Sequence, residues 1–423
     1  MSGWPEHPVI YEINTAVWLD EGNRSTGRRR TLADITPVEW DTITPTGVDA
    51  VWLMGVWERS PAGTTIARRN PALLASFDDA LPDLNPEDVI GSPYCVRRYE
   101  ADQIFGGPNG LAAARAALAE RGVRLVLDYV PNHVAPDHPW TIDHPESFVR
   151  GDQGRLEREP TAWLAVGDSV IARGRDPYFP PWPDVLQLDA FAPALRAATV
   201  DILSDIAGQC DGIRCDMAML MMNDVFSRTW GGQVGPPPAE EFWTEVVPEL
   251  RARHPGVVLL AEAYWDREWD LQQQGFDFCY DKRLYDRLTA ADAPLVRQHL
   301  LAPQAYQTRL VRFVENHDEP RVASVLPEPA QRANLVAWAW TAHEGDQHVV
   351  VVNLSATPAQ GRVWLGRSDL GRGEQWLLTE LLDGGAYNRS GDELEESGLF
   401  VDLLPWGFHL LRVRAASTAE VTV

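Results

Sequence analysis

Short apolar runs alternate with longer amphipathic stretches from the start of the chain to Arg321. The runs are rich in Val, Leu and Ile, which is typical of strands buried on both faces of a sheet. The stretches between them place apolar residues at helical spacing, as Leu195, Val200, Leu203 and Ile206 do. Strands that alternate with helices predict an α/β fold with a parallel sheet. The predicted strands are 8–14, 48–56, 123–130, 212–217, 257–263, 276–280 and 310–315, and the predicted helices are 37–44, 111–121, 193–209, 240–253, 282–289 and 294–301.

Polar residues follow four of these strands at the point where each strand ends. Residues 123–133 read VRLVLDYVPNH, 210–217 read CDGIRCDM, 256–265 read GVVLLAEAYW and 313–321 read FVENHDEPR. One such polar ending is usually a solvated turn, but four of them indicate a shared opening. In a β/α barrel all strands point to one end, where their C-terminal ends build the active site. The pattern therefore predicts a TIM-type barrel with a site at that end.

The remaining segments predict loops, an insert and a second domain. Residues 21–35 and 57–92 are predicted to be loops, and 134–191 are too long for an ordinary βα connection and too irregular for regular helices. After Arg321, β-prone runs follow one another without helices, which predicts an all-β antiparallel domain. The expected organisation is a first barrel part at 1–133, an insert at 134–191, a second barrel part at 192–332 and a C-terminal β-domain at 333–423. The β-prone runs of that domain are 335–341, 348–353, 362–365, 376–382 and 399–413.

Charge and composition exclude some classes of partner. The chain has 423 residues, and 37 Lys and Arg against 61 Asp and Glu give a net charge of −24. Proteins that bind nucleic acid or anionic membranes carry basic patches, so we expect neither partner. The 17 Trp residues are many; most are expected to be core or interface residues, and a minority could stack on sugar rings. A neutral ligand fits this composition, whereas oligomeric state cannot be read from it.

The cysteines and the N-terminus favour a cytoplasmic protein. None of the four cysteines, Cys95, Cys210, Cys215 and Cys279, forms a Cys-x-x-Cys pair, so buried free thiols in a reducing compartment are expected. The N-terminus MSGWPEHPVI lacks the basic and apolar regions of a signal peptide. No apolar run reaches the roughly 20 residues that a membrane span needs.

Three carboxylates at strand ends suggest glycoside chemistry. Asp216, Glu262 and Asp318 come from three different strands. Cleavage of a glycosidic bond needs one carboxyl group that donates a proton and one carboxylate that attacks carbon or activates water. Arg214 lies two residues before Asp216, on the same face of the strand, and we expect it to lower the pKa of that carboxyl group. His133 and His317 could donate hydrogen bonds to sugar hydroxyl groups.

Structural roles are open for each of these residues when it is taken alone. A strand-end carboxylate is often a helix cap, the Arg214–Asp216 pair could be purely structural, and a loop Tyr such as Tyr94 is as often half-buried packing as a sugar platform. His133, His138 and His144 lie near one another in sequence, but their spacing matches no compact metal-ligand motif, so no metal is expected.

Four ordered motifs resemble the α-amylase family of glycoside hydrolases. They are DYVPNH at 128–133, GIRCDM at 212–217, the Glu of LLAEAYW at 262 and FVENHD at 313–318. The resemblance extends to PVIYEIN and VDAVWLMGV as the first two strands, to SPY at 92–94, to WPDVLQLD at the end of the insert called domain B, and to the C-terminal β-domain, domain C. It covers most of the chain and implies a retaining enzyme that cleaves or transfers α-glucosidic bonds of oligosaccharides or α-glucans.

The resemblance also implies a role for each site residue. Asp216 would be the nucleophile, Glu262 the general acid/base and Asp318 the carboxylate that stabilises the transition state. Many members of the family bind calcium near the Asn of the first motif, here Asn132, but the other ligands of such a site cannot be read from this sequence. The substrate-binding residues would be Tyr94, Asp128, His133, Arg214 and His317, with Asp128 orienting Arg214.

One departure from the family pattern bears on activity. Family members carry a helix, an eighth strand and another helix between the fourth motif and domain C, a unit of roughly 30 residues or more. Here only 16 residues separate Asp318 from Asn334, where the β-domain is predicted to begin. We therefore expect an incomplete barrel of seven strands, whose gap stays open, is filled by another segment or chain, or closes by direct pairing of the first and seventh strands.

This departure leaves a second function open. A barrel without its eighth unit could be a catalytically impaired, carbohydrate-binding or structural relative. The intact set of three carboxylates and one arginine favours the enzyme. A nucleotide-binding protein is not expected, because no Gly-x-Gly-x-x-Gly and no phosphate loop follow the first strand. No cofactor is expected. Linkage preference, chain length and the balance of hydrolysis and transfer cannot be read from the sequence.

Overall fold

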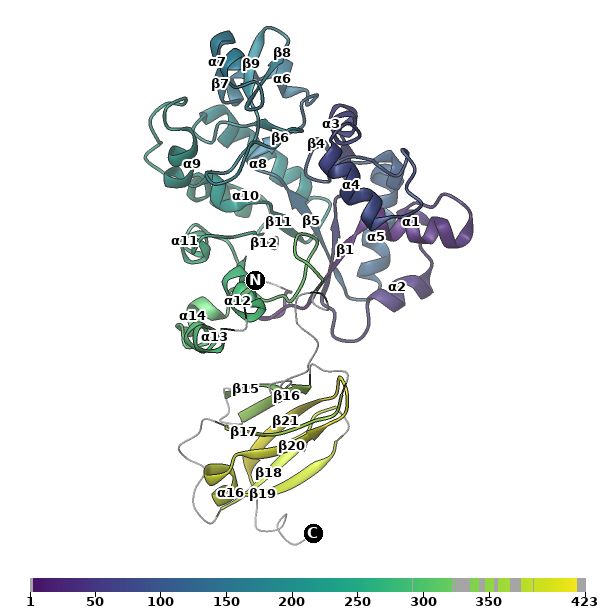
Figure 1. Cartoon of the computed structure of the whole chain (residues 1–423), viewed down its shortest axis with the longest axis vertical. Helices are drawn as coiled ribbons and strands as arrows, with labels where there is room; N and C mark the ends of the chain where they lie inside the picture. Colours follow the sequence, from purple (N-terminus) through teal and green to yellow (C-terminus); the bar gives the residue numbers. More distant parts are fainter. Residues whose placement is uncertain are drawn as a thin grey trace. The chain divides into compact units, whose positions relative to one another are not determined.

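The chain divides into two compact units, Met1–Glu319 and Pro320–Val423, each described here by itself (Figure 1). The computed structural model describes residues 3–290, 292–321, 324, 335–341, 347–353, 357–365, 374–382 and 384–416. The division of the first unit into a barrel and an insert at 134–191 stays a prediction, as does the exact start of the second domain.

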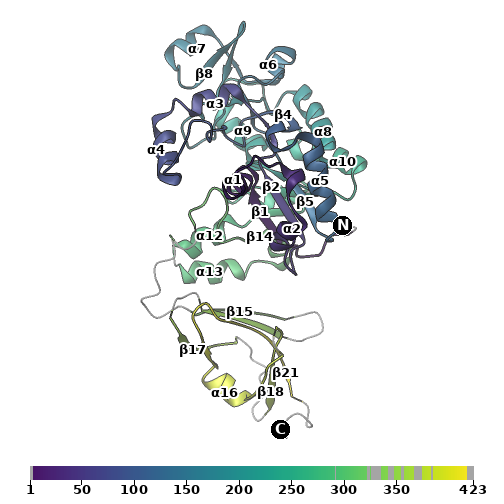
Figure 2. The ribbon, with the colours of Figure 1, turned by 90° about the vertical axis from the view of Figure 1, so that its right-hand side faces the viewer.

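The first unit is built on a curled sheet of seven parallel strands, in the order β1-β2-β5-β11-β12-β13-β14 (Figures 1 and 2). Within the described residues β1 and β14 are the two ends of this sheet. The fold is thus a TIM-type barrel that is incomplete in the part of the chain described, as the sequence predicts. The strands are Ile10–Asn14 (β1), Ala50–Met54 (β2), Arg124–Tyr129 (β5), Gly212–Cys215 (β11), Val258–Ala261 (β12), Phe278–Tyr280 (β13) and Leu310–Val311 (β14).

The two faces of this sheet bury different residues, because successive side chains of a strand point to opposite faces. In β2, Ala50, Trp52 and Met54 pack on the inner face of the curl, whereas Val51 and Leu53 pack against the helices outside. All five are buried, which explains why the strand reads as a continuous apolar run.

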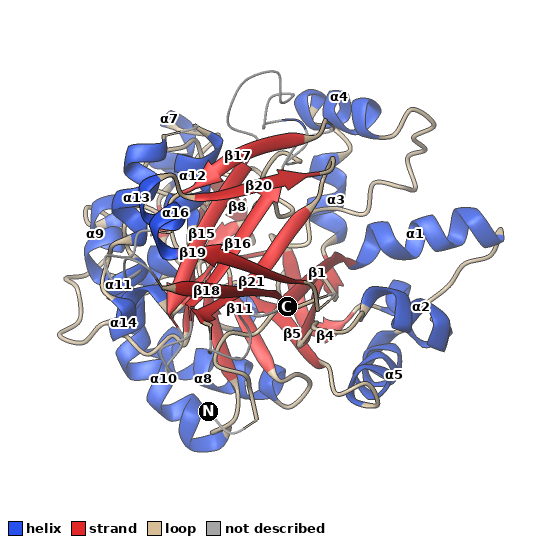
Figure 3. Cartoon of the chain, turned by 90° about the horizontal axis from the view of Figure 1, so that it is seen from below, coloured by secondary structure: helices blue, strands red, loops and turns tan. Residues whose placement is uncertain are grey.

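Helices cover the outer face of the sheet, as the view from below shows (Figure 3). The first unit contains the helices α1 (Thr15–Thr26), α2 (Pro37–Ile43), α3 (Pro61–Ala67), α4 (Pro71–Ala80), α5 (Gly107–Ala119), α8 (Pro193–Ala207), α9 (Asn223–Trp230), α10 (Phe242–Arg253), α11 (Glu268–Gln273), α12 (Lys282–Thr289), α13 (Ala293–Leu300) and α14 (Gln304–Gln307). The short 3-10 helices are Leu32–Asp34 (η1), Gln103–Phe105 (η2), Pro145–Ser147 (η3) and Ala218–Met221 (η4).

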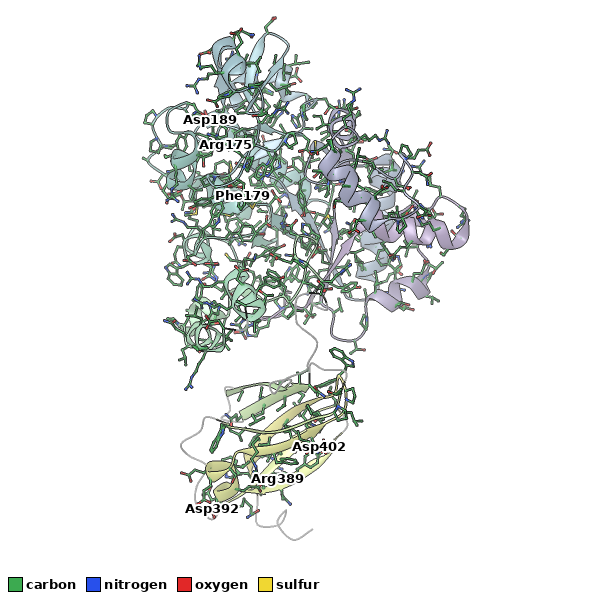
Figure 4. All side chains as sticks on the ribbon, viewed as in Figure 1. Arg175, Phe179, Asp189, Arg389, Asp392 and Asp402 are labelled. Carbon is green, nitrogen blue, oxygen red and sulfur yellow. The ribbon has the colours of Figure 1, made fainter. Side chains whose placement is uncertain are left out.

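Small sheets decorate the C-terminal end of the barrel strands. β3 (Trp57–Arg59) pairs with β4 (Val96–Ala101), and β6 (His133–Val134) pairs with β10 (Leu186–Gln187). Between β6 and β10 lie α6 (Trp140–Asp143), α7 (Gln153–Arg158) and a three-stranded sheet of β7 (Arg150–Gly151), β9 (Ser169–Ala172) and β8 (Trp163–Val166). Phe179, labelled in Figure 4, is 66% exposed on the loop that leads from β9 to β10.

Two predicted loops are wrong, because local capping turns them into helices. Helix α1 begins at Thr15 and extends into the predicted loop 21–35, and Asn14 caps it by accepting a hydrogen bond from Val17 N. In the predicted loop 57–92, Ser60 and Asn70 cap α3 and α4, each of which has a proline in its first turn.

The seventh strand is shorter than the predicted 310–315. Only Leu310–Val311 pair, and they pair with β13 alone among the described residues. Val314 is 55% exposed, so the apolar residues that follow Val311 lie outside the sheet.

The second unit is an antiparallel β structure, as predicted. One sheet has the order β15-β16-β21-β18-β19, and β17 pairs with β20. The predicted run 399–413 is two strands, since a turn at 404–407 with Trp406 at φ 58° divides it. The elements are β15 (Leu335–Thr341), β16 (Gln347–Asn353), β17 (Ala359–Val363), β18 (Gln375–Glu380), β19 (Ala386–Ser390), α16 (Gly391–Glu396), β20 (Leu399–Leu403) and β21 (Phe408–Ala415).

Two further observations concern the whole of the described chain. Within it, no helix combines the length and apolar character that crossing a membrane requires. All four cysteines are free and buried, as expected from their spacing.

Candidate active site

Arg214 is the centre of the site. It lies on β11 with 0% of its side chain exposed, and three carboxylates surround its guanidinium group. Nη1 is 2.8 Å from Asp216 Oδ1 and 3.5 Å from Asp128 Oδ1, and Nη2 is 2.8 Å from Glu262 Oε2. Nε donates a hydrogen bond to the Tyr280 hydroxyl group at 3.2 Å. The buried Arg214 cation therefore lies between a carboxylate on β5 and the carboxylates that directly follow β11 and β12.

Glu262 is held by two further donors. Its Oε2 accepts a hydrogen bond from Met217 N at 2.6 Å, and its Oε1 accepts one from the Tyr264 hydroxyl group at 2.7 Å. Met217 directly follows Asp216 and has φ 41°, a left-handed conformation that costs a residue with a side chain of order 1 kcal/mol or more. The turn after β11 thus aims a backbone N–H at the carboxylate from β12.

Arg214 lowers the pKa of Asp216, as expected, but the net shift of that pKa is upward. Burial and the negative charge of Glu262 raise the pKa of Asp216, and they outweigh the attraction of Arg214, which lowers it. Two carboxylates and one cation in a dry site bind a proton more firmly than a solvated carboxylate does. Burial and Glu262 therefore favour the protonated form of Asp216 near neutral pH.

Asp128 links the floor of the site to the loop after β2. Its Oδ2 accepts hydrogen bonds from Trp52 Nε1 at 3.1 Å and from Gly55 N at 3.2 Å. Gly55 has φ 77°, and a Cβ there would lie 2.7 Å from Pro93 Cβ, so only glycine lets the segment before Tyr94 pack this closely. The Trp52 ring lies under the Arg214 guanidinium at 5.1 Å, which adds a cation–π contact.

His317 and Asp318 form the mouth of the site together with Tyr94. The Tyr94 hydroxyl group is 2.7 Å from His317 Nε2, and the two rings stack with centroids 5.4 Å apart. His317 Nε2 is also 3.2 Å from Asp318 Oδ2, whose side chain is 50% exposed. The charge of Asp318 raises the pKa of Asp216, so the third carboxylate lies within electrostatic reach of the first.

His317 is a cation in this arrangement. Burial opposes its charge, but its hydrogen bonds with Asp318 and Glu12 outweigh burial and raise its pKa to about 10. Burial also favours the neutral form of Asp318, yet the hydrogen bond and charge of His317 lower the pKa of that carboxyl group overall. The mouth thus carries a charged pair.

His133 occupies the boundary between the barrel and the insert. It is 6% exposed in β6, and its ring lies 5.1 Å from that of Trp182. Burial lowers its pKa to about 4, and a hydrogen bond with the Tyr94 backbone offsets only part of the effect. His133 is therefore neutral at neutral pH, and it meets the other predicted residues through Tyr94. The structure thus brings all eight predicted site residues into one connected region.

Sequence reasoning missed four side chains of this region, namely Glu12, Trp52, Tyr264 and Tyr280. Tyr264 lies two residues after Glu262, and Trp52 and Tyr280 lie on the inner face of their strands. The two-residue period of a strand could have placed these three near the site. Nothing local in the sequence connects Glu12 with His317, since 305 residues separate them.

Comparisons with known proteins find relatives by sequence and by fold. No family model matches the chain. The α-amylase MalA of Haloarcula japonica is 25% identical over 330 residues, which are 75% of this chain and 40% of MalA. The trehalose synthase/amylase TreS of Mycobacterium tuberculosis is 25% identical over 280 residues, which are 62% of this chain and 40% of TreS. These relatives place the chain among proteins similar to the α-amylase family. The chain spans less than half the length of these curated relatives.

Solved structures show that the fold is shared with α-amylases. An α-amylase from Lactobacillus plantarum aligns with a TM-score of 0.59 and 18% identity, over 96% of this chain and 99% of that one. The maltogenic α-amylase AmyB from Thermotoga neapolitana aligns with a TM-score of 0.60 and 17% identity, over 97% and 99% of the two chains.

The surroundings of Asn132 do not fit the calcium ion that many members of the family bind. Asn132 is 1% exposed, and its Oδ1 accepts a hydrogen bond from Gln187 Nε2 at 2.8 Å. Gln187 Oε1 in turn lies 3.3 Å from both Asn132 Nδ2 and Arg175 N. Calcium prefers several oxygen ligands, including carboxylates. Two neutral side-chain amides that are hydrogen-bonded to each other do not supply this ligand set.

Proposed function

We propose that this protein is a retaining glycoside hydrolase or transglycosylase that acts on α-glucosidic bonds of oligosaccharides or α-glucans. The observation that supports it most is the placement of Asp216 and Glu262 on neighbouring nitrogens of the buried Arg214, with Asp318 in electrostatic reach. In retaining enzymes the two working carboxyl groups are about 5 Å apart, whereas inverting enzymes separate them by roughly 6.5–9.5 Å. Two carboxylates on one guanidinium favour the closer arrangement.

In the proposed reaction Asp216 attacks the anomeric carbon while Glu262 protonates the leaving oxygen. The covalent glycosyl-enzyme is then released when Glu262 takes a proton from water or from a sugar hydroxyl group, which attacks the same carbon. Asp318 stabilises the positive charge that develops on the sugar ring. Arg214 holds Asp216, and Asp128 orients Arg214.

The remaining predicted residues bind the sugar. Tyr94 offers its ring face to the sugar ring at the cleavage point, while His133 and His317 donate hydrogen bonds to hydroxyl groups. The relatives support an α-glucan substrate, because their names include an α-amylase, an oligo-1,6-glucosidase and a maltosyltransferase. A neighbouring structure, an α-amylase from Geobacillus thermoleovorans, is complexed with acarbose. A reducing compartment such as the cytoplasm suits the four unpaired thiols.

The test is turnover on a panel of nitrophenyl α-glucosides, maltooligosaccharides and α-1,6-linked oligosaccharides. We expect release of product with the α-anomer formed first, seen by proton NMR, and loss of turnover by at least about 10³-fold in Asp216→Asn. Asp205→Asn, an exposed aspartate on α8, is the matched control and keeps wild-type rates. Binding of maltotriose without any cleavage over days would contradict the proposal.

A further inference from the structure

The segment after β14 needs an anchor that the sheet does not supply. β14 is only two residues long, and within the described residues it pairs with β13 on one side alone. In a closed barrel each strand is fixed by neighbours on both sides. The loop that carries His317 and Asp318 follows this short end strand, so its position depends on contacts made by the loop itself.

Glu12 of β1 makes such a contact from the opposite end of the sheet. Its Oε1 is 2.5 Å from His317 Nδ1, although the two residues are 305 positions apart. Glu12 shares its face of β1 with Ile10, which packs with the inner cluster, while Tyr11 on the other face is 48% exposed. The ion pair therefore runs on the inner side of the curl, between the two end strands of the sheet.

The His317 ring is constrained on each of its remaining sides. Nε2 faces the Tyr94 hydroxyl group at 2.7 Å and Asp318 Oδ2 at 3.2 Å. The Trp52 ring meets it edge-on with centroids 5.5 Å apart. A carboxylate at Nδ1 fixes the orientation of an imidazole and favours its doubly protonated form, so Nε2–H points toward Asp318 and Tyr94.

We propose that Glu12 is a positioning residue that holds His317, and through it Asp318, against the site from across the open side of the sheet. This inference rests on the proposed function, since it gives the ion pair a role in the reaction. Glu12 itself does not touch the reacting atoms. It replaces, with one charged contact, the support that a neighbouring strand would give to the segment after β14.

Removal of the Glu12 charge is expected to change the pH dependence of the reaction. Hydrogen bonds with Asp318 and Glu12 raise the pKa of His317 to about 10 against the effect of burial. Without the charge of Glu12 the His317 pKa falls, although the hydrogen bond and charge of Asp318 still raise it. His317 is protonated below its pKa, so the variant loses the cation at a lower pH than the wild type does. The ionisable groups that face His317 are Glu12, Tyr94, Asp128, Arg214 and Asp318.

The experiment compares kcat/KM of Glu12→Gln with that of the wild type from pH 5 to pH 9. A lowered His317 pKa predicts a loss that is larger at pH 8 and above than at pH 5.5, where His317 stays protonated in both proteins. Glu12→Asp keeps the charge and should keep the wild-type pH profile. Glu21→Gln, an exposed glutamate on α1, is the matched control and should change nothing.

A second readout does not depend on turnover. NMR titration of the wild type and of Glu12→Gln, with labelled histidine and His317→Gln for assignment, should show the His317 midpoint move to lower pH by more than one unit. A loss of activity that is equal at all pH values would overturn the proposal, because it would indicate direct contact of Glu12 with substrate or a merely structural role. An unchanged His317 midpoint would overturn it as well.

The two proposals fail in distinguishable ways. If the wild type cleaves no α-glucoside, the proposed function fails, and the affinity for maltotriose at pH 5.5 and pH 8 replaces kcat/KM. Weaker binding of Glu12→Gln at pH 8 alone would then support the positioning role, and equal binding at both pH values would contradict it.

Discussion

Arg214→Gln tests the electrostatic centre of the site. The substitution removes the one buried cation that lies between Asp128, Asp216 and Glu262 and leaves three carboxylates in the same dry region. Gln is shorter and neutral, so it can donate one or two hydrogen bonds but cannot balance the charge. The variant should therefore be both inactive and less stable.

The magnitude follows from the cost of an uncompensated buried charge. Removal of one partner of a buried ion pair destabilises proteins by about 3–5 kcal/mol. With about 2.1 cal/mol/K of unfolding entropy per residue, the 319 residues of the first unit predict a decrease in Tm of about 4–8 °C.

The loss of stability in Arg214→Gln should depend on pH. Burial and Glu262 already raise the pKa of Asp216 in the folded state, while Arg214 lowers it. Without Arg214 the folded-state pKa rises further. A carboxyl group whose pKa is higher in the folded state destabilises the protein as the pH rises from the unfolded pKa, about 3.9, through the folded one. The difference in Tm between wild type and variant should stay constant well below the wild-type folded pKa of Asp216, about 8, and grow as the pH rises to and past that value.

The assay is differential scanning calorimetry of both proteins at pH 5, 6.5 and 8. Calorimetry resolves separate transitions if the two units unfold independently. Arg69→Gln, an exposed arginine, is the control and should shift Tm by less than about 1 °C. A variant whose Tm equals that of the wild type at pH 8, or whose deficit is larger at pH 5, would refute the reasoning.

Three further predictions address single contacts. Tyr264→Phe removes the hydroxyl group that donates a hydrogen bond to Glu262. Hydrogen bonds to charged groups contribute about 1.5–3 kcal/mol, so kcat should fall by about 10–100-fold. An unchanged kcat in steady-state kinetics would show that this contact does not serve the reaction. Gly55→Ala should raise KM and destabilise the fold by about 1–3 kcal/mol in urea unfolding, because the new Cβ would meet Pro93 at 2.7 Å in a left-handed backbone; wild-type KM and stability would contradict this. EDTA and added calcium should leave Tm the same, because the Gln187 amide already occupies the acceptor of the first-motif asparagine, and a calcium-dependent rise of several degrees would overturn that assignment.

The fold could be predicted where the hydrophobic pattern had a clear period. The continuous apolar runs around Val51 and Leu259 are strands buried on both faces, and their polar ends do meet at one site. The pattern failed where local capping decides the outcome, as at Asn14, or where a strand lies at the end of the sheet, as at Val311. Neither a cap nor an unpaired edge changes the hydrophobic period.

The site could be predicted as a set of residues but not as a network. Sequence spacing placed Arg214 and Asp216 on one face, yet the sign of the net pKa shift of Asp216 depends on burial and on Glu262, which only the fold brings close. The Glu12–His317 contact depends on the closure of the curled sheet, because it joins its two end strands. Contacts of this kind have no local sequence signal.

The most direct test of the central claim is to trap the covalent intermediate. A fluorinated α-glucosyl fluoride, which forms a glycosyl-enzyme faster than water releases it, is incubated with the protein, and the labelled peptide is sequenced by mass spectrometry. The account predicts one glucosyl adduct per chain, attached to Asp216. An adduct on another residue, or none at all from a protein that cleaves α-glucosides, would contradict it.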